Sequence, residues 1–434
     1  MKKILLFGAG KSATVLIDYL LEQAAGRHWQ LIVADTNPEL AEQKIRGSAY
    51  GKAIAANVTD EAERSRLVSE ADLVISMLPA FLHALVAEDC IRYAKNLLTA
   101  SYADEGLKNK AAAIKEKGIL FLCEMGLDPG IDHMSAMQLI HAIQNQDGQI
   151  ISFKSHCGGL VAPESDDNPW HYKISWNPRN IILAGKAGAI YLENGQETTI
   201  PYGQLFQQQE QISVDELGRF GWYANRDSLS YTSLYGLQSA ETFIRTTLRH
   251  PAFMKGWKYV VALQLTDEEK RYDTTGKTLR DLFAEHLSLQ PVITIPADVQ
   301  AQLNYLGMND DETIPPPGKV SAAGLLQFAA EQKLALQPQD KDMIVMQHEI
   351  IYTAQGQKQE VTSTLVVKGE NSLYTAMAKT VGLPLGIAAK LILTGQISLT
   401  GLHLPILPDI YEPVLRELHE RGVSFEERTR TLSA

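Results

Sequence analysis

Residues 4–21 read ILLFGAGKSATVLIDYLL, and the fold of the first domain can be predicted from this stretch. The apolar run Ile4–Phe7 is typical of a buried strand, and the amphipathic run Thr14–Leu21 is typical of a helix. Between them lies a G-x-G-x-x-A turn, in which the first glycine allows a tight bend, the second lets the backbone approach a pyrophosphate, and the small last residue lets the helix pack on the strand. The stretch therefore predicts a dinucleotide site at a helix N-terminus, with the contact residues Gly8, Gly10, Lys11, Ser12 and Ala13.

The same alternation of strand and helix continues to about Phe121, because short apolar runs alternate with amphipathic ones. The runs that we expect to be strands are Ile4–Phe7, Leu31–Ala34, Leu73–Ser76, Leu97–Ala100 and Gly118–Leu122. Since polar residues do not interrupt these runs, the strands should be covered on both faces, as in a Rossmann-type doubly wound parallel sheet. The first domain is therefore predicted to be α/β.

A second pattern begins after Asp128-Pro129-Gly130 with the helical run Ile131–Gln144. The strand-like runs that follow are Ile150–Ser155, Tyr259–Leu265, Met343–Tyr352 and Val361–Val367. The last two flank the turn Gln355-Gly356-Gln357 and alternate apolar with polar residues, which is typical of a hairpin. Helical runs between about Asp267 and Gln339 predict a small helical insertion. We expect an α+β substrate domain with a mixed or antiparallel sheet.

The composition excludes several classes of protein. The 434 residues include 40 Lys plus Arg and 51 Asp plus Glu, a net charge of -11, so neither a nucleic acid nor a membrane surface is an expected partner. Cys90, Cys123 and Cys157 form no C-x-x-C pair, which favours a reducing, cytoplasmic location over a disulfide framework. The apolar stretch Leu73–Ala87 is shorter than the roughly 20 residues of a membrane-spanning helix. No zinc-binding spacing joins the histidines, so we expect no metal.

An acidic residue, Asp35, ends the second expected strand. A carboxylate there accepts hydrogen bonds from the adenine-side ribose 2′-hydroxyl and repels a 2′-phosphate, so Asp35 favours NAD over NADP. FAD and S-adenosylmethionine folds share parts of this pattern, and in a purely structural reading Asp35 caps the helix that starts near Pro38. Ser76 and Leu78 follow another strand and are expected to edge the nicotinamide crevice.

Several longer strings are distinctive enough to compare as units. They are Ala100-Ser101-Tyr102, EMGLDPGIDH (124–133), CGGLVAPE (157–164), Asp167-Asn168-Pro169, YKISW (172–176), NRDS (225–228), RTTLR (245–249) and DMIVMQH (342–348). In this order, over essentially the whole chain, they resemble the glutamate-forming saccharopine dehydrogenases, also called saccharopine reductases.

This resemblance implies a reaction of lysine metabolism. In the family, saccharopine is oxidised at its secondary amine carbon by hydride transfer to a nicotinamide dinucleotide, and the imine is hydrolysed to glutamate and L-2-aminoadipate 6-semialdehyde, or the reverse. The resemblance also implies homodimers and three domains: 1–128 with 390–434 returning to it, 129–266 with 340–389, and the helical 267–339. Fungal members have a basic residue at the position of Asp35 and use NADP, so the chain departs from them there.

The three carboxylates of saccharopine require cations with forked donors, which arginine supplies better than lysine. Positions that contact the substrate in the resembled family match Arg226, Thr247, Leu248 and Arg249. At the expected sheet edge, the residues nominated for cofactor or substrate contact are Ser101, Tyr102, Leu127 and Asp128, and Trp176 is expected to pack near the nicotinamide.

No residue identifies itself as the general acid or base. Asp128 is placed to hold the amine, and Tyr102 is placed to bind a carboxylate or relay a proton. The candidates are Asp128, Tyr102 and Cys157, with His133 and His156 as weaker alternatives and a bound water as the remaining one.

Two other functions are compatible with the sequence. One is a related imine-reducing enzyme such as carboxynorspermidine synthase, and the other is a dinucleotide-binding sensor or scaffold without chemistry. A polyamine substrate requires acidic side chains where saccharopine requires arginines, so Arg226 and Arg249 favour saccharopine.

Overall fold

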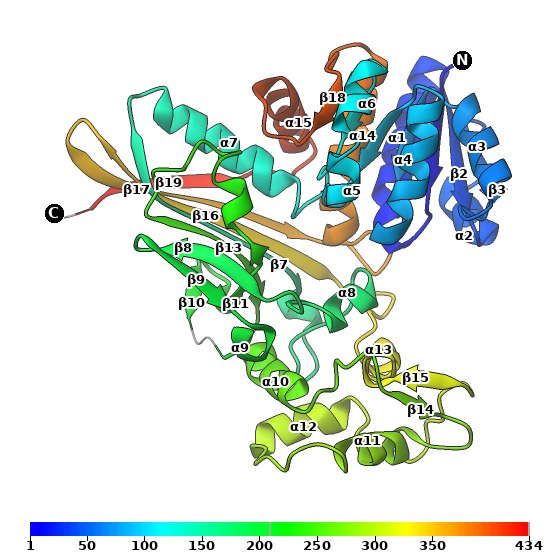
Figure 1. Cartoon of the computed structure of the whole chain (residues 1–434), viewed down its shortest axis with the longest axis vertical. Coiled ribbons are helices and arrows are strands. Elements are labelled where there is room, and N and C mark those ends of the chain that lie inside the picture. The colour runs from blue at the N-terminus through cyan, green and yellow to red at the C-terminus, as the bar shows by residue number, and fades with distance from the viewer. Residues whose placement is uncertain (208–209, 433–434) are drawn as a thin grey trace. The chain divides into compact units, whose positions relative to one another are not determined.

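The computed structural model describes residues 1–207 and 210–432, which form two compact units (Figure 1). Unit 1 comprises Met1–Asp147 and Leu373–Phe425, and unit 2 comprises Gly148–Ser372 and the residues from Glu426 onward. Part of the C-terminal chain therefore returns to the first unit. The bounds differ from the expected 1–128 and 390–434, because helix α7 (Ile131–Gln144) belongs to unit 1 and the last strand, β19 (Glu426–Thr431), pairs with β17 (Gln357–Lys368) in unit 2.

Unit 1 is built on a parallel sheet, and the predicted Rossmann-type fold is confirmed. In spatial order its described strands are β18 (Gly401–His403), β6 (Leu120–Leu122), β5 (Asn96–Thr99), β4 (Leu73–Ser76), β1 (Lys3–Phe7), β2 (Gln30–Asp35) and β3 (Gly51–Ala55). The chain moves outward from β1 in both directions, so a switch point lies between β1 and β4, where the carboxyl ends of the strands leave a crevice. Strand β3 was not predicted, because its short GKAIA sequence is only partly buried.

Helices cover both faces of this sheet. They are η1 (Lys11–Ala13), α1 (Thr14–Arg27), α2 (Pro38–Ile45), α3 (Glu61–Glu70), η2 (Ala80–Leu82), α4 (His83–Arg92), α5 (Glu105–Lys108), α6 (Ala111–Glu116), α7, α14 (Ala376–Leu393) and α15 (Pro408–Glu420). Leu5 and Phe7 of β1 join one apolar cluster with residues of α3 and α4. Ile4 and Leu6 alternate with them along the strand and are equally buried, so they pack on the opposite face.

Helix α14 brings the C-terminal part of the chain against α1 (Figure 1). Two glycines one turn apart make this approach possible, because a Cβ at Gly382 would lie 2.7 Å from the Leu16 nitrogen and a Cβ at Gly386 would lie 2.5 Å from Tyr19 Cδ1. Among the described residues, α14 is also the one helix long and apolar enough to span a membrane, yet 78% of it is buried inside the protein. Such burial is typical of a core helix.

Unit 2 is built on a long mixed sheet, as predicted. Its strands are β7 (Gln149–Val161), β8 (Ala189–Glu193), β9 (Gln196–Ile200), β10 (Gln211–Val214), β11 (Gly218–Ala224), β12 (Arg226–Asp227), β13 (Thr242–Arg249), β16 (Asp342–Ala354), β17 and β19. Strand β13 is parallel to β7, whereas β16 is antiparallel to both β7 and β17. The predicted hairpin around Gln355-Gly356-Gln357 is the β16–β17 pair.

The prediction of a strand at Tyr259–Leu265 is wrong, because helix α10 (Pro251–Ala262) occupies most of this segment. The His250 side chain accepts a hydrogen bond from Ala252 N at 3.2 Å, and Pro251 occupies the first helical position, so the helix start is well specified. Phe253 and Trp257, one turn apart, stack at 4.9 Å in the core. This packing outweighs the strand preference of the short β-branched run that follows.

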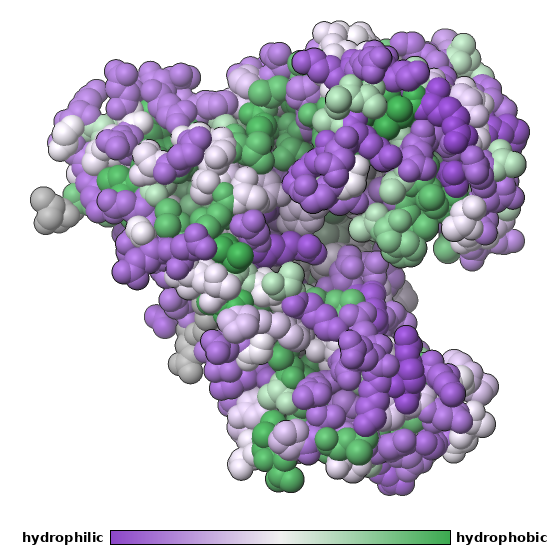
Figure 2. Space-filling view, in the orientation of Figure 1, coloured by the Kyte–Doolittle hydropathy of each residue, from purple (hydrophilic) through white to green (hydrophobic). Residues whose placement is uncertain are grey.

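The helical insertion is present within unit 2. Its elements are α11 (Leu279–Leu287), α12 (Ala297–Tyr305) and α13 (Ala322–Lys333), together with the unpredicted two-stranded sheet of β14 (Arg271–Asp273) and β15 (Lys319–Ser321). The other short helices of the unit are η3 (Pro163–Ser165), α8 (Pro178–Ile182), α9 (Tyr202–Leu205) and η4 (Leu229–Tyr231). The face of the molecule drawn in Figure 2 is mostly hydrophilic, which agrees with the burial of the apolar clusters inside each unit.

The α1–α14 contact leads to a test of stability. Gly386→Ala should lower the free energy of unfolding by about 1–3 kcal/mol, because the new methyl overlaps the buried Tyr19 ring. Gly26→Ala, in α1 but with no atom within 4 Å of its Cβ position, is the matched control and should leave stability unchanged or raise it by up to about 1 kcal/mol. Denaturant unfolding measures both, and equal stabilities for the two variants would contradict the close packing.

Candidate functional site

The glycine turn after β1 has the geometry that a dinucleotide requires. Gly8 has a φ of 100° and approaches the loop after β4 so closely that a Cβ would lie 3.0 Å from Met77 O. Gly10, in contrast, has no atom within 4 Å of its Cβ position and is exposed. A side chain at Gly10 would therefore fill the space through which a pyrophosphate reaches the backbone at the start of η1 and α1, so these residues fit the group.

Asp35 lies at the end of β2, where its carboxylate is fixed against the turn. Its Oδ2 accepts a hydrogen bond from Ala9 N at 2.7 Å, and its Oδ1 accepts one from Asn37 N at 2.9 Å. The cap of α2 is Asn37, whose side chain accepts a hydrogen bond from Glu39 N, so the alternative reading of Asp35 as the helix cap is wrong. The acid is thus placed where an adenine-side ribose is expected.

A buried lysine lies beside the turn and was not predicted from the sequence. Lys44 of α2 is 8% exposed, and its Nζ donates a hydrogen bond to Gly10 O. Burial lowers the pKa of Lys44 to about 8, and the negative charge of Asp35 opposes that shift. The turn therefore has one basic and one acidic side chain next to it.

Loops that follow β4 and β5 are joined by a histidine. His83 Nδ1 lies 2.8 Å from Ser76 Oγ, and His83 Nε2 lies 2.8 Å from Ser101 Oγ. Burial lowers the pKa of His83 to about 4, so the ring is neutral near pH 7. It links two residues that were nominated from the sequence, Ser76 and Ser101, at the carboxyl edge of the sheet. Leu78 is half-buried in the first of these loops.

Tyr102 and Asp128 lie together at the same edge. Tyr102 follows β5, Asp128 lies in the segment between β6 and α7, and Tyr102 Oη is 3.5 Å from Asp128 Oδ1. Both side chains are half-buried, whereas the neighbouring Leu127 is buried. A half-buried phenol next to a half-buried carboxylate is accessible to a ligand and can hold or pass a proton.

Unit 2 contributes a separate group on one face of its sheet. Cys157 of β7 pairs with Thr247 of β13, which pairs with Tyr223 of β11, and Arg249 is two residues after Thr247 on the same face. Leu248 points to the other face, into an apolar cluster with Trp222 and Leu160. Only the main chain of Leu248 could therefore contact a ligand bound by Arg249.

Arg249 is a buried cation with an incomplete set of hydrogen bonds. It is 3% exposed, and its Nη1 donates to Leu248 O at 2.8 Å. Its guanidinium carbon lies 5.4 Å from the Tyr172 ring centre and 5.6 Å from that of Phe253. Among the described residues, Arg249 Nε has no hydrogen-bond partner. Because leaving a charged donor unsatisfied is costly, an anionic ligand would be the natural partner.

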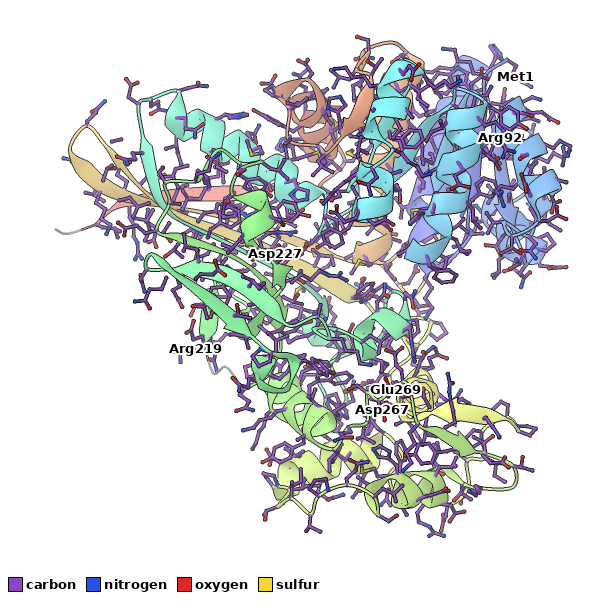
Figure 3. The ribbon with its side chains drawn as sticks, viewed as in Figure 1. Met1, Arg92, Arg219, Asp227, Asp267 and Glu269 are labelled. Atoms are coloured by element: carbon purple, nitrogen blue, oxygen red, sulfur yellow. The ribbon has the colours of Figure 1, made fainter. Side chains whose placement is uncertain are left out.

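Arg226 and Trp176 occupy different surroundings in unit 2. Arg226 is exposed on the short strand β12, next to Asp227 (labelled in Figure 3), and has a φ of 54°, a left-handed conformation that is uncommon for a side chain of this size. Trp176 is partly buried, and its indole nitrogen donates to Tyr172 Oη at 3.3 Å. Trp176 is therefore connected through Tyr172 to Arg249.

The nominated residues divide between the two units. In unit 1 they are Gly8, Gly10, Lys11, Ser12, Ala13, Asp35, Ser76, Leu78, Ser101, Tyr102, Leu127 and Asp128. In unit 2 they are Cys157, Trp176, Arg226, Thr247, Leu248 and Arg249. Sequence reasoning missed Lys44 and His83, since each belongs to an ordinary amphipathic helix, and only their burial beside a loop distinguishes them. Within the described residues, no group of three or more His, Cys, Asp or Glu could hold a metal ion.

Models of two protein families match the chain. The saccharopine dehydrogenase NADP binding domain matches residues 4–122, and the saccharopine dehydrogenase C-terminal domain matches residues 126–423. The first match lies within unit 1, which contains the glycine turn. Unit 1 is therefore a domain that binds a nicotinamide dinucleotide.

Curated relatives match over nearly the whole chain. Saccharopine dehydrogenase [NADP(+), L-glutamate-forming] from Saccharomyces cerevisiae is 32% identical, over 99% of this chain and 99% of its own length. The mitochondrial alpha-aminoadipic semialdehyde synthase of Mus musculus is 32% identical over 98% of this chain, but the match covers only 47% of that protein. The chain thus spans about half the length of the mouse relative and nearly all of the yeast one.

Solved structures give the same result for the fold. The apo saccharopine dehydrogenase (L-Glu forming) of Saccharomyces cerevisiae superposes with a TM-score of 0.84 at 31% identity, covering 99% of this chain and 100% of that one. A homospermidine synthase from Legionella pneumophila, solved with NAD, reaches a TM-score of 0.60 at 10% identity, covering 98% of this chain and 91% of that one. This second likeness concerns the fold alone.

The open space at Gly10 gives a test of the dinucleotide site. Gly10→Val should fold normally, because nothing lies within 4 Å of the new Cβ position, but should bind NADH at least about tenfold more weakly, since the side chain fills the pyrophosphate path. Fluorescence titration with NADH measures this, with Gly10→Ala expected to be intermediate. Wild-type affinity in Gly10→Val would show that the dinucleotide does not pass the turn.

Proposed function

The chain belongs to the saccharopine dehydrogenase family, and from that premise we propose that it oxidises the secondary amine of saccharopine with a nicotinamide dinucleotide. The imine is then hydrolysed to glutamate and L-2-aminoadipate 6-semialdehyde, and the reaction is reversible. The observation that supports this most directly is the Tyr102–Asp128 pair at the edge of the same sheet whose glycine turn is open at Gly10. The setting of the reaction is lysine metabolism.

Each unit has side chains suited to one part of this reaction. When bound to unit 1, the nicotinamide group supplies the hydride acceptor. Asp128 holds the amine nitrogen through a charge-assisted hydrogen bond. Tyr102, whose Oη lies 3.5 Å from Asp128 Oδ1, donates to a substrate carboxylate or relays the amine proton. In unit 2, Arg249 offers its unsatisfied Nε to a carboxylate, with Thr247 and the Leu248 main chain beside it.

The remaining unit 2 residues have supporting roles in this proposal. Exposed Arg226 binds a second carboxylate of saccharopine. Cys157 shares the face of Thr247 and Arg249 and is the one cysteine at a candidate site. Trp176 stays a candidate for packing near the nicotinamide, and its bond to Tyr172 fixes its indole ring.

We further propose that NAD is preferred over NADP. The relatives from fungi are named for NADP(+), but in this chain the β2 strand ends in Asp35, whose carboxylate is fixed by two backbone hydrogen bonds. A fixed negative charge at the ribose repels a 2′-phosphate and accepts a hydrogen bond from a 2′-hydroxyl. We also propose a location in the cytoplasm, because Cys90, Cys123 and Cys157 form no C-x-x-C pair, and the homodimer that is implied for the family.

The two alternative functions, a related imine-reducing enzyme and a sensor or scaffold without chemistry, agree less well with these residues. A carboxynorspermidine-type substrate requires acidic side chains around its ammonium groups, whereas the nominated side chains of unit 2 include Arg226 and Arg249. A sensor or scaffold without chemistry does not require the Tyr102–Asp128 pair. Formation of NADH on addition of saccharopine excludes the sensor.

A spectrophotometric assay with saccharopine tests the reaction and the cofactor together. We expect kcat/KM with NAD to exceed that with NADP by at least about tenfold, and Asp35→Ser to reduce this preference, because the repulsion of the 2′-phosphate is removed. Equal efficiency with both cofactors would show that Asp35 does not face the ribose. No reduction of either cofactor by saccharopine would end the proposal.

The role of Arg226 can be tested with a closely matched control. Arg226→Ala should cost about 2–4 kcal/mol of transition-state stabilisation if the guanidinium binds a substrate carboxylate. Arg219, labelled in Figure 3, is also an exposed arginine and lies on the adjacent part of the chain in β11, so Arg219→Ala should leave kcat/KM unchanged. Unchanged kinetics in Arg226→Ala would remove it from the site.

A further inference from the structure

We propose that Glu124 is a positioning residue for this reaction, and that together with His133 it holds Tyr102 next to Asp128. The inference rests on the proposed function, because Tyr102 and Asp128 are the groups that it assigns to the substrate. Glu124 was not nominated from the sequence, and His133 was considered only as a weak candidate for the base. Both residues lie in unit 1, as do the segments that they join.

Glu124 binds the chain on both sides of Tyr102. Its backbone nitrogen donates to Ser101 O at 3.1 Å, and its side-chain Oε1 accepts a hydrogen bond from Ala103 N at 3.1 Å. Ser101 and Ala103 immediately precede and follow Tyr102. A residue fixed at both of its neighbours has little freedom in its own φ and ψ, so Glu124 sets the direction of the Cα–Cβ bond of Tyr102.

The second carboxylate oxygen of Glu124 reaches α7. Glu124 Oε2 lies 2.8 Å from His133 Nε2, and His133 is in the first turn of that helix. His133 is fully buried and Glu124 is 2% exposed. His133 is therefore too enclosed to touch a substrate, and the geometry makes it an anchor rather than the general base.

The first turn of α7 in turn fixes the segment that carries Asp128. Asp132 N donates to Leu127 O at 3.1 Å, and Asp132 Oδ1 accepts a hydrogen bond from Gly130 N at 2.6 Å. These two bonds fix the backbone before and after Asp128, as Glu124 fixes the backbone before and after Tyr102. One carboxylate thus connects the backbone around Tyr102 to the helix turn that holds the backbone around Asp128.

The cost of this arrangement argues that it serves the site rather than the fold. Glu124 has a φ of 59°, which is strained for a residue with a side chain, and it buries a carboxylate almost completely. An apolar residue would fill the same space without burying a carboxylate, although the backbone strain would remain. What an apolar residue lacks is two acceptor oxygens that can be directed to two different loops.

A second anchor, His83 at the start of α4, acts on the same segment. His83 bonds Ser101 Oγ and Ser76 Oγ, each at 2.8 Å, so Ser101 is tied to the loop that is expected to edge the nicotinamide. Hydrogen bonds thus run from Ser76 through His83, Ser101 and Glu124 to His133, along the carboxyl edge of the sheet. These hydrogen bonds fix the loops expected to bind the dinucleotide relative to the residues expected to bind the substrate.

Kinetics of Glu124 variants test the proposal. Glu124→Ala should lower kcat/KM for saccharopine by about 10- to 100-fold, mainly through kcat, while the NADH dissociation constant changes by less than about threefold, because the glycine turn is untouched. Glu124→Gln keeps an acceptor for Ala103 N and should recover much of the loss. Wild-type kcat in folded Glu124→Ala, or no recovery in Glu124→Gln, would overturn the proposal.

The matched control is Glu417→Gln, because Glu417 is a carboxylate of unit 1 on α15 that bonds Tyr19 and Lys390 rather than any loop of the site. The free energy of unfolding of Glu417→Gln is the reference for the Glu124 variants, and Glu417→Gln should keep wild-type kcat. If Glu124→Ala does not fold, Glu124→Asp replaces it, since the shorter side chain does not reach both Ala103 and His133.

A double-mutant cycle shows whether Glu124 acts through Tyr102. The factor by which Tyr102→Phe lowers kcat should be at least about threefold smaller in the Glu124→Ala background than in the wild type. The reason is that a phenol that is already mispositioned contributes less to kcat. Equal costs in both backgrounds would mean that the two residues are independent and would overturn the proposal.

Hydrogen–deuterium exchange separates this proposal from the assignment of the reaction. Glu124→Ala should speed exchange at the Ala103 and Gly130 amides, whatever the substrate is, while Glu417→Gln should not. If wild-type protein does not oxidise saccharopine, the proposed function fails, yet the exchange result still decides the positioning role. Unchanged exchange at both amides in Glu124→Ala would overturn it.

Discussion

The close approach of Gly8 to Met77 is the contact on which the rest of unit 1 depends. With 3.0 Å between Met77 O and the place of a Cβ, only glycine lets the turn after β1 lie against the loop after β4. The contact lies at the carboxyl end of the β1–β4 pair, where the strand order reverses and where a sheet of this type is expected to bind its ligand. Ser76, Ser101 and Asp128 reach the crevice because parallel strands all end at the same edge.

The two units differ in the charged side chains at their candidate binding residues. In unit 1 the groups near the turn are a fixed carboxylate, Asp35, and a buried amine, Lys44, whose pKa is lowered by burial. In unit 2 the cation is Arg249, which is surrounded by aromatic rings and keeps an unsatisfied Nε. A ligand with a ribose hydroxyl suits the first environment, and a ligand with carboxylates suits the second.

Secondary structure was predicted correctly where a single short segment contains both the hydrophobic pattern and the turn residues. The glycine turn, the Ile131–Gln144 helix and the β16–β17 hairpin each follow from spacing and turn residues in a short stretch, and each is confirmed. The strand expected at Tyr259–Leu265 failed because the cap at His250 and the stacking of Phe253 on Trp257 favour a helix. Strands β3, β14 and β15 were missed since short, exposed strands have no alternating pattern to read. The strands β8 to β13, β18 and β19 were missed as well, and among them β13 is largely buried on both faces and so does not alternate apolar with polar residues.

The Rossmann-type turn, the acid at the end of β2 and the family could be predicted from the amino-acid sequence, because each is a property of residues close together in the chain. The folded chain shows, in addition, that Asn37, not Asp35, caps α2, that Leu248 faces away from Arg249, and that Glu124 bonds the chain on both sides of Tyr102. These facts depend on which face a strand presents and which loops meet at a sheet edge. Residues distant in the chain set both, so no local pattern encodes them.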